Sequence, residues 1–428
     1  MGELSKTLGT VSGTALMLNT VLGAGVLTLP GLAAAQVGEQ ALWTWIACAA
    51  ATIPLLVVFT VLSSRYPEAG GVGHIAKLAF GSYGQVITSA LFLGAVFLGL
   101  PSIALTAGYY VASVADAPPT AVAVALVLCA GMMNLAMPGT ASKIGTWIAA
   151  AVLAFLLILV VASLGVLATN GALAAGTPNE TSAYIPVPNA ALLVPFMLVF
   201  FAFTGWEVAI GASEEFQEPR RTIPRAVAAS FAITIIFYIV CSLIVVRAGE
   251  PAFGNAPFLA ILAPDPSRWT GALIAIGTVV LLTANLFAAI WAVSRMVFSL
   301  ARERLLPTIL SRVEQGTPRA AVTTVCAIIA GVAALDGMGI VDVDVLFAMA
   351  GQNFLIIYAS SAGALIVLAQ GAVDRVVGVI ALATALVLIG WTGLNLLYPL
   401  ILVLMGLCAL LWRDRRYRFG KEVDANQS

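Results

Sequence analysis

The sequence predicts an all-α integral membrane protein that crosses the bilayer with twelve transmembrane helices, two of them broken near the middle. The chain of 428 residues is 61% hydrophobic and only 9% charged, with a mean hydropathy of +1.04. Its apolar residues gather in segments of about 20, the length that one helix needs to cross the hydrocarbon core. Two of these segments carry glycines at mid-span, where a simple membrane anchor needs none.

The twelve predicted helices follow one another along the whole chain. Each is a run of apolar residues bounded by polar residues, prolines or glycines. The shortest polar intervals are 133–143 and 390–394. The predicted spans are 8–36, 40–64, 85–114, 119–137, 141–169, 190–213, 223–247, 269–301, 319–338, 342–370, 373–391 and 393–412.

The polar and sulfur-containing residues exclude several classes of protein. The formal net charge is zero and no basic tract runs through the body of the chain, so nucleic acid is not expected as a partner. The five cysteines lie inside apolar spans without a Cys-x-x-Cys spacing, and the one histidine, His74, is placed in a polar loop. We predict no metal site, no cofactor and no enzymatic activity, because no nucleophile, base or metal-ligand set is available.

The distribution of basic residues predicts the orientation of the chain. Positive side chains concentrate in the cytoplasmic loops of membrane proteins. With a cytoplasmic N-terminus, all but two of the 20 Lys and Arg residues fall on the inner side, and only Arg247 and Arg268 fall outside. We therefore expect a multi-pass protein of the cell inner membrane whose N- and C-termini are both cytoplasmic.

The order of the spans divides most of the chain into two halves of opposite orientation. Spans 1–5 begin inside and spans 6–10 begin outside, and the first span of each half is the one with glycines at its centre. This is the layout of a 5+5 inverted repeat. Spans 11 and 12 are interpreted as packing helices or as the contact of a homodimer. The predicted parts are a cytoplasmic N-terminus at 1–7, a first repeat at 8–169, an extracytoplasmic loop at 170–189, a second repeat at 190–370, spans 11 and 12 at 371–412 and a cytoplasmic tail at 413–428.

The first interruption is predicted at Gly23-Ala-Gly-Val26, within the first span. Glycine has no side chain, so the backbone there can approach a ligand closely. The half-helix that follows presents unpaired N–H groups and the positive end of its dipole, which suits a carboxylate. The alternative interpretation is a pair of small residues that only permits tight helix packing.

The second interruption is predicted at Phe201-Ala-Phe-Thr-Gly-Trp-Glu207, within the sixth span. The carbonyl groups released around Phe203 to Gly205 are suited to an ammonium group. A molecule with a carboxylate and an ammonium on one carbon is an α-amino acid, so we predict that such a substrate binds between the two interruptions. The predicted substrate-binding residues are Gly23, Ala24, Gly25, Val26, Phe201, Ala202, Phe203, Thr204 and Trp206.

The side chains around the second interruption predict which amino acids bind. Phe201, Phe203 and Trp206 are bulky and apolar, and no Lys, Arg or Asp lies inside a neighbouring span. Such a site leaves a charged substrate side chain without a partner, so neutral apolar substrates are favoured. Phe201 is the residue that we expect to close over the substrate.

Glu207 is the one acid deep in a predicted span. An ionised carboxylate at bilayer depth costs about 2.5–3.5 kcal/mol, so the position calls for a functional explanation. Either Glu207 binds and releases a proton during transport, or it is a fixed carboxylate at the start of a half-helix, where the dipole favours it.

A mixed-charge segment from Glu214 to Arg225 follows. It is either a solvated loop that fixes topology or an inner gate with partners on the eighth span, such as Arg295.

The ordered set of motifs resembles the amino acid–polyamine–organocation superfamily. Gly23-Ala-Gly-Val26 looks like the break in its first span, and Tyr66-Pro-Glu-Ala-Gly-Gly71 is similar to its first inner loop. Phe201-Ala-Phe-Thr-Gly-Trp-Glu207 resembles its sixth-span signature, and Ser294-Arg295 with Leu306-Pro307 its eighth-span signature. The chain looks most like the bacterial branch that exports neutral amino acids such as methionine and the branched-chain ones.

The resemblance implies a leucine-transporter-type fold in which helices 1 and 6 are broken. It also implies a substrate carboxylate at Gly23 to Val26, a substrate amine at the carbonyls of Phe201 to Thr204, and Glu207 at the position of the family's span-6 acid. One position departs from the pattern: proton-coupled relatives carry a lysine in the middle of span 5, where this chain has Val152. Lysine-based proton coupling is therefore not expected. Nor is a sodium site, because no Ser/Thr pair lies at the needed depth on span 8.

These observations predict a secondary active transporter that exports neutral apolar L-amino acids, such as methionine, leucine, isoleucine and valine, by alternating access. A proton-coupled importer or an exchanger of the same fold is the alternative within this class, because a binding site does not fix the direction of transport. A non-transporting amino acid receptor or subunit is the alternative from another class. The expected partners are a neutral amino acid, the lipid bilayer and protons as a candidate coupling ion.

Overall fold

The computed structural model describes residues 8–67, 71–136, 141–170, 194–207, 213–264, 269–314, 317–391 and 396–425. Within these ranges the chain forms helices and connecting turns, without a β-strand. Nine helices in the described part are long and apolar enough to cross a membrane. The predicted extracytoplasmic loop, 170–189, lies almost entirely outside the described residues.

Most helices lie where the apolar segments predict them. Four short 3-10 helices, η1 (Gly38–Gln40), η3 (Ser213–Glu215), η4 (Glu250–Ala252) and η5 (Thr308–Ser311), lie in the connections. The α-helices are α1 (Thr10–Val21), α2 (Ala24–Leu27), α3 (Leu29–Val37), α4 (Ala41–Arg65), α5 (Gly71–Ala112), α6 (Pro119–Ala136), α7 (Ala141–Thr169), α8 (Phe196–Ala202), α10 (Pro219–Ala248), α11 (Pro257–Leu262), α12 (Trp269–Arg302), α13 (Arg319–Gly337), α14 (Val343–Val367), α15 (Ala372–Trp391) and α16 (Leu397–Ala425).

The first predicted span is interrupted twice. α1 ends at Val21, and α2 begins at Ala24 after the non-helical residues Leu22 and Gly23. Of the predicted segment Gly23 to Val26, Gly23 lies in this interruption, whereas Ala24, Gly25 and Val26 already belong to α2. A second interruption at Thr28, which the sequence did not predict, separates α2 from α3.

The sixth predicted span also stops being helical near its middle. α8 ends at Ala202, and Phe203 to Glu207 continue without helical structure. Gly205 has a φ of 109°, a left-handed conformation that glycine adopts without steric cost. The residues that follow, 208–212, lie outside the described part of the chain.

The third predicted span begins much earlier than the sequence indicates. Helical structure runs from Gly71 to Ala112 and is kinked at Gly81, whose φ is 71°. His74, which we expected in a loop, therefore lies in a helical segment before the kink. The prediction placed the start at residue 85 because the preceding segment contains polar side chains such as Lys77 and lacks the apolar density of a membrane span.

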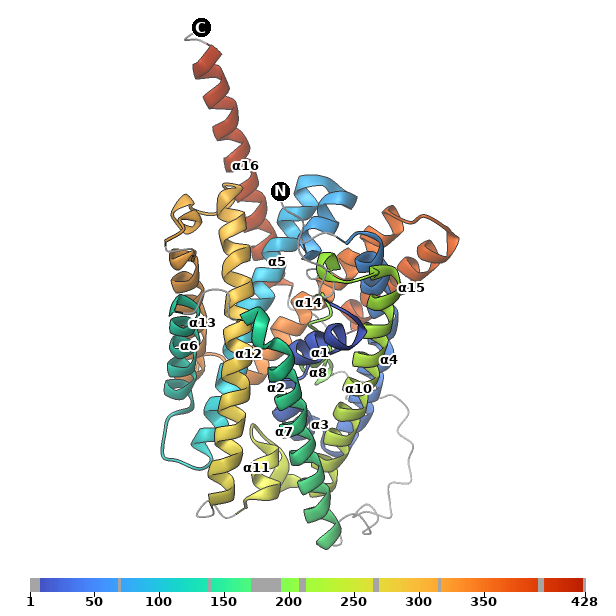
Figure 1. The fold of residues 1–428 in the computed structure, drawn as a ribbon, viewed down its shortest axis with the longest axis vertical. Coiled ribbons are helices and arrows are strands. Elements are labelled where there is room, and N and C mark those ends of the chain that lie inside the picture. The colour runs from blue at the N-terminus through green and yellow to red at the C-terminus, as the bar shows by residue number, and fades with distance from the viewer. Residues whose placement is uncertain are drawn as a thin grey trace.

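α14 is the central helix of the fold. It packs against α4, α5, α8 and α15, and of the nine candidate spans it has the largest buried share. Figure 1 shows α12, α6 and α13 on one side of this core and α4 and α10 on the other. The ends of α12 and α16 lie together at one end of the molecule, whereas α11 lies at the opposite end (Figure 1). The two interruptions are thus surrounded by packed helices.

Candidate functional site

The interruption of the first span frees backbone donors that find no acceptor in the described ranges. The N–H of Val26 donates to the carbonyl oxygen of Gly23 at 3.2 Å. Among the described residues, none accepts a hydrogen bond from the N–H groups of Gly23, Ala24 or Gly25. These residues are buried, so water does not readily replace the missing partners. Grouped N–H donors next to a helix start are suited to a carboxylate.

The interruption of the sixth span frees backbone acceptors, as judged from the part of the chain that the structure describes. The N–H of Phe203 donates to Phe200 O at 2.9 Å, and both the N–H and the hydroxyl of Thr204 donate to Phe201 O, at 3.1 and 2.7 Å. Within the described ranges, no group donates to the carbonyl oxygens of Phe203 or Thr204. Such carbonyl oxygens can accept hydrogen bonds from an ammonium group.

The two interruptions lie against each other at Gly25. A Cβ atom on Gly25 would lie 3.1 Å from Ala202 Cβ and 3.2 Å from the hydroxyl oxygen of Tyr238. A glycine at position 25 therefore permits α2 to approach the end of α8 closely. Of the predicted site residues, Gly25 and Ala202 are the pair that joins the two interruptions directly.

Tyr238 of α10 connects both interruptions through its hydroxyl group. The hydroxyl oxygen lies 3.0 Å from the carbonyl oxygen of Val21 and 2.7 Å from that of Ala202, the last residues of α1 and α8. Its ring packs 5.1 Å from that of Phe203 and 4.9 Å from that of Trp45, centroid to centroid. A single buried side chain thus contacts the released carbonyl end of each half-helix.

Two further buried tyrosines bind groups that the interruptions release. Tyr110 of α5 donates to the carbonyl oxygen of Leu27 at 2.8 Å, where α2 ends. Tyr358 of α14 donates to Oε2 of Glu207 at 3.0 Å, and the same oxygen accepts from the N–H of Gly205 at 3.0 Å. In a membrane, each backbone group freed from a helix needs such a partner inside the protein.

α12 also reaches the first interruption. The side-chain amide of Asn285 donates to the carbonyl oxygen of Asn19 at 3.2 Å. Its nitrogen lies 3.5 Å from the point that a Cβ atom on Gly23 would occupy. α12 therefore contacts the first interruption through Asn285.

The sequence did not single out Asn285 or these tyrosines. Each has a polar tip on a long apolar helix, Tyr110 in the last turn of α5 and the others well inside their helices, where a hydroxyl or amide needs an internal partner. That position is the signal by which the sequence could have indicated them. The residues concerned are Tyr110, Tyr238, Tyr358 and Asn285.

Phe201 is half-buried and belongs to an aromatic cluster between α8 and α14. Its ring centroid lies 5.0 Å from that of Phe347 and 6.3 Å from that of Phe354. Gly99 of α5 leaves room for this ring, because a Cβ atom there would lie 2.7 Å from Phe201 Cε2. Three helices thus shape the apolar surroundings of Phe201.

The other two predicted aromatic residues are packed completely. Phe203 is fully buried against Trp45 and Tyr238, and Trp206 is fully buried with its ring 5.6 Å from that of Phe231. Of the three aromatic residues, Phe201 alone keeps partial exposure in this structure. It is therefore the one best placed to contact a substrate.

The mixed-charge segment after the second interruption makes a local ion pair. Glu218 and Arg221 lie 3.5 Å apart at the start of α10, and both side chains are largely exposed. Arg295 of α12, which we expected as a partner of this segment, stacks over the ring of Trp291 at 3.9 Å and donates to the carbonyl oxygen of the same residue. These contacts agree with a solvated segment.

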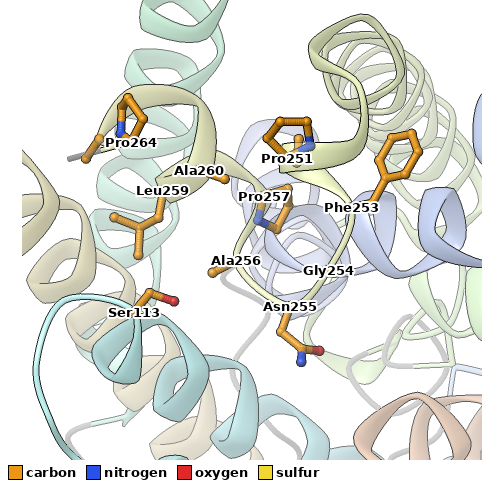
Figure 2. A pocket seen from close by; sticks show the side chains of 12 residues that line it. Ser113, Pro251, Phe253, Gly254, Asn255, Ala256, Pro257, Leu259, Ala260 and Pro264 are labelled. Atoms are coloured by element: carbon orange, nitrogen blue, oxygen red, sulfur yellow. The ribbon is translucent and has the colours of Figure 1, made fainter. Parts of the chain in front are cut away.

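A cavity of about 400 Å³ lies away from the interruptions, at the α11 end of the molecule. It is lined by Ser113 of α5 and by the segment 251–264 (Figure 2). This segment is bonded to the first span: Thr28 donates to Asn255 O at 3.0 Å, and the N–H of Gly254 donates to Gly31 O at 3.2 Å. The segment is therefore attached to α3.

A helical membrane protein with two interrupted spans that meet among packed helices has the architecture of a transporter. The family model for amino acid permeases matches residues 8–419. The chain belongs to this family, within the amino acid–polyamine–organocation superfamily, as the motifs indicated. It is thus a multi-pass membrane protein that transports a small amino acid substrate, and its relatives are transporters rather than enzymes.

Individual relatives and a solved structure agree with this family. The chain is 27% identical over 411 residues to the uncharacterized amino acid permease YecA of Bacillus subtilis, covering 94% of this chain and 95% of the relative. It is 28% identical over 252 residues to the L-methionine/branched-chain amino acid exporter YjeH of Escherichia coli, covering 58% of each. The crystal structure of MhsT in complex with L-phenylalanine superimposes with a TM-score of 0.66 at 14% identity, covering 91% of this chain and 100% of that one. The fold is therefore of the leucine-transporter type.

Proposed function

We propose that the protein exports neutral apolar L-amino acids, such as methionine, leucine, isoleucine and valine, by alternating access. The observation that carries this proposal is the meeting of the two interruptions at Tyr238. Among the described residues, the N–H groups of Gly23 to Gly25 have no acceptor, and the carbonyl oxygens of Phe203 and Thr204 have no donor. A zwitterion satisfies both sets at once.

The surroundings of Phe201 support an apolar substrate side chain. Phe201, Phe347 and Phe354 form an aromatic cluster beside the interruption, and Gly99 accommodates the Phe201 ring. A charged substrate side chain would lose its hydration there without gaining a partner. The similarity to an exporter of methionine and branched-chain amino acids supports the same substrate class and the outward direction.

We propose twelve spans arranged as a 5+5 inverted repeat with both termini in the cytoplasm. Three predicted spans are missing from the nine candidates: the part of the first span before Leu29, the sixth span, and α16, whose apolar part is the shorter segment Leu397–Arg413. The first and sixth spans are missing because their interruptions leave only short helices. Adding these three spans to the nine gives the predicted twelve. An inner-membrane location and a homodimer through spans 11 and 12 belong to the same proposal.

The proposal is tested by counterflow in proteoliposomes that contain the purified protein. Liposomes loaded with unlabelled methionine or leucine should accumulate the labelled amino acid, whereas loading with lysine or glutamate should give the rate of protein-free liposomes. Export predicts that cells lacking the protein retain more of these amino acids and that its expression lowers the retained amount. Binding without any flux would favour the receptor interpretation. Equal rates for charged amino acids would contradict the apolar site.

A proton-coupled importer or exchanger is the second candidate, and Glu207 is the observation that favours it. Its carboxylate lies within the membrane and contacts two neutral donors, Gly205 N–H and the hydroxyl of Tyr358. A glutamine keeps a carbonyl oxygen that can accept both bonds but cannot exchange a proton. If Glu207 is a fixed carboxylate that only accepts these two hydrogen bonds, Glu207→Gln should retain counterflow with an unchanged pH profile. Glu207→Ala should then lose counterflow. A pH profile that flattens in Glu207→Gln would assign the proton role to Glu207.

A further inference from the structure

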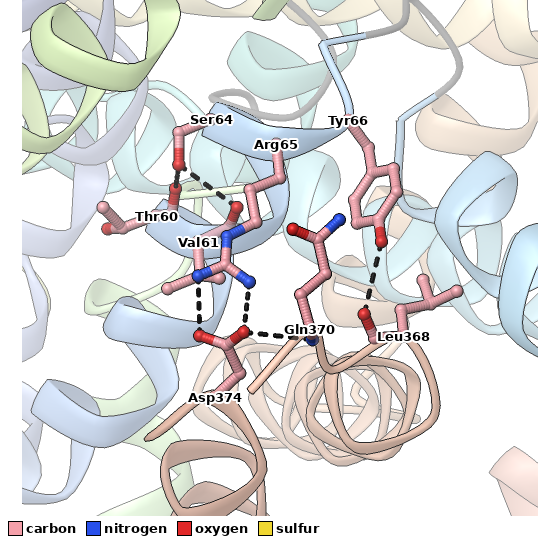
Figure 3. Close-up of polar contacts among 8 residues, drawn as sticks. All are labelled: Thr60, Val61, Ser64, Arg65, Tyr66, Leu368, Gln370 and Asp374. Atoms are coloured by element: carbon pink, nitrogen blue, oxygen red, sulfur yellow. Dashed lines mark hydrogen bonds and ion pairs between the residues drawn. The ribbon is translucent and has the colours of Figure 1, made fainter. Parts of the chain in front are cut away.

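The inner ends of α4 and α15 are joined by a cluster of polar contacts (Figure 3). Arg65 is the last residue of α4, and Asp374 lies in the first turn of α15. The guanidinium group binds the carboxylate with both terminal nitrogens: Nη2 donates to Oδ1 at 2.7 Å, and Nη1 donates to Oδ2. The exposed fraction of the Asp374 side chain is 7%, against 29% for Arg65. The acid is thus largely shielded from water.

The turn between α14 and α15 is held by the same cluster. The backbone N–H of Gln370 donates to Oδ2 of Asp374 at 3.2 Å. The hydroxyl of Tyr66, the residue after Arg65, donates to the carbonyl oxygen of Leu368 at 3.3 Å. The end of α4 is therefore bonded to α15 and to the last residue before the α14–α15 turn. Tyr66 also begins the inner-loop motif, for which the predicted function has no role.

The shielded Arg65–Asp374 pair is expected to stabilise the local structure more than an exposed ion pair does. Exposed pairs contribute about 0–1 kcal/mol to stability, because water and salt screen them. A bidentate pair fixes geometry as well as charge, and removing one partner of a shielded pair leaves the other without compensation. The alternative interpretation is that the pair only stabilises the fold at the membrane surface. The position of α14 distinguishes the two interpretations.

α14 joins this cluster to the interruption of the sixth span. About 10 residues before Leu368, or roughly 15 Å along the helix axis, α14 carries Tyr358, which donates to Glu207. The ring of Tyr358 also packs 4.5 Å from that of Phe59 on α4. α4 thus contacts α14 at the ring pair inside the membrane, and beyond its inner end it is bonded to Leu368, which follows α14, and to Asp374 of α15.

We propose that the Arg65–Asp374 ion pair is a positioning clamp. It holds α14 in register with α4, keeps Tyr358 on Glu207, and thereby sets the rate of the transport cycle rather than the affinity for substrate. Neither Arg65 nor Asp374 touches the substrate site. The clamp rests on the proposed transport function, so its test includes one measurement that does not depend on substrate.

The first measurement is counterflow per binding-competent transporter, with the number of transporters determined by equilibrium binding of labelled substrate. Asp374→Asn and Arg65→Gln should each lower this rate about tenfold and leave the Kd for substrate within about twofold. The double variant should lose no more than either single variant, because both remove the same interaction. Arg221→Gln is the matched control: it removes an arginine from the exposed pair with Glu218, and its rate should equal that of the wild type.

The second measurement is amide hydrogen exchange of the purified protein without substrate. Residues 366–374 should exchange faster in Asp374→Asn and Arg65→Gln than in the wild type and Arg221→Gln. The clamp would be overturned if hydrogen exchange or the rate per transporter were unchanged in the variants. It would also be overturned if the losses in the double variant were additive, or if the variants lost only substrate affinity. A wild-type protein that binds and transports no amino acid, but shows the expected exchange, would contradict the proposed function and leave the clamp as a structural contact.

Discussion

Tyr238 is the residue on which the geometry of the two interruptions depends most directly. It is fully buried, and its one hydroxyl serves the terminal carbonyl oxygens of both α1 and α8. Tyr238→Phe removes the hydroxyl but keeps the ring contacts with Trp45 and Phe203. Leaving buried carbonyls without a donor costs about 1–3 kcal/mol. We expect lower thermal stability and substrate affinity weakened about tenfold, measured by equilibrium binding to the purified protein.

Tyr398 provides the matched control for this substitution. Its hydroxyl also donates to a backbone carbonyl oxygen, that of Gly94, at 3.0 Å, but it lies on α16 away from both interruptions. Tyr398→Phe should lower stability without changing substrate affinity. Equal affinities in Tyr238→Phe and the wild type would show that Tyr238 does not organise the site.

At the scale of the helices, the central contact of the candidate site is the close approach of α2 to the end of α8 at Gly25. Gly25→Val would place its side chain against Ala202 and the Tyr238 hydroxyl, where the first added atom is already 3.1–3.3 Å from its neighbours. Overpacking of this kind costs about 1–3 kcal/mol and moves the backbone. We expect folded protein that has lost substrate binding, because moving α2 away from the end of α8 displaces the N–H groups of Gly23 to Gly25 relative to the second interruption.

Gly165 of α7 is the control for Gly25. It is exposed, and a Cβ atom there meets nothing within 4 Å. Gly165→Val should therefore bind substrate as the wild type does. Normal affinity in Gly25→Val, measured in the same binding assay, would mean that the contact between α2 and α8 is not part of the site.

The sequence predicts long elements better than short ones. The apolar segments of α4, α6, α12 and α13 agree with the structure to within a few residues, because each is uniformly apolar and ends at polar residues, prolines or glycines. The start of α5 before Gly81 and the short helix α11 were missed, since neither has the length or the apolar density of a span.

The interruptions of the two spans could be predicted, whereas the side chains that contact them could not. Glycines at mid-span directly mark the interruptions near Gly23 and Gly205, since they are costly in a continuous helix. Tyr238 and Tyr358 lie far from these glycines in the chain, so only the packing of α10 and α14 brings them together. Trp45 lies near a predicted span end, which suggests lipid contact, yet the fold buries it against Phe203.

At the scale of the whole molecule, the protein is a helical membrane transporter, and we propose that backbone atoms form most of its substrate site. The Tyr238 hydroxyl contacts the last carbonyl oxygen of α1 and that of α8, and so links the two interruptions. α12 reaches the first interruption through Asn285, and α14 reaches the second through Tyr358. Packed helices thus contact both interruptions through these two side chains.

The most direct test of this account is competition between the best-transported amino acid and two analogues that each lack one charged end. With labelled methionine bound to the purified protein, unlabelled L-methionine should displace it. Two analogues, L-methioninamide without the carboxylate and N-acetyl-L-methionine without the ammonium group, should each compete at least about tenfold more weakly. The first leaves the backbone N–H groups without their charged partner, and the second does so for the carbonyl oxygens. Competition by either analogue as strong as that of L-methionine would contradict recognition of both charged ends by the interrupted helices.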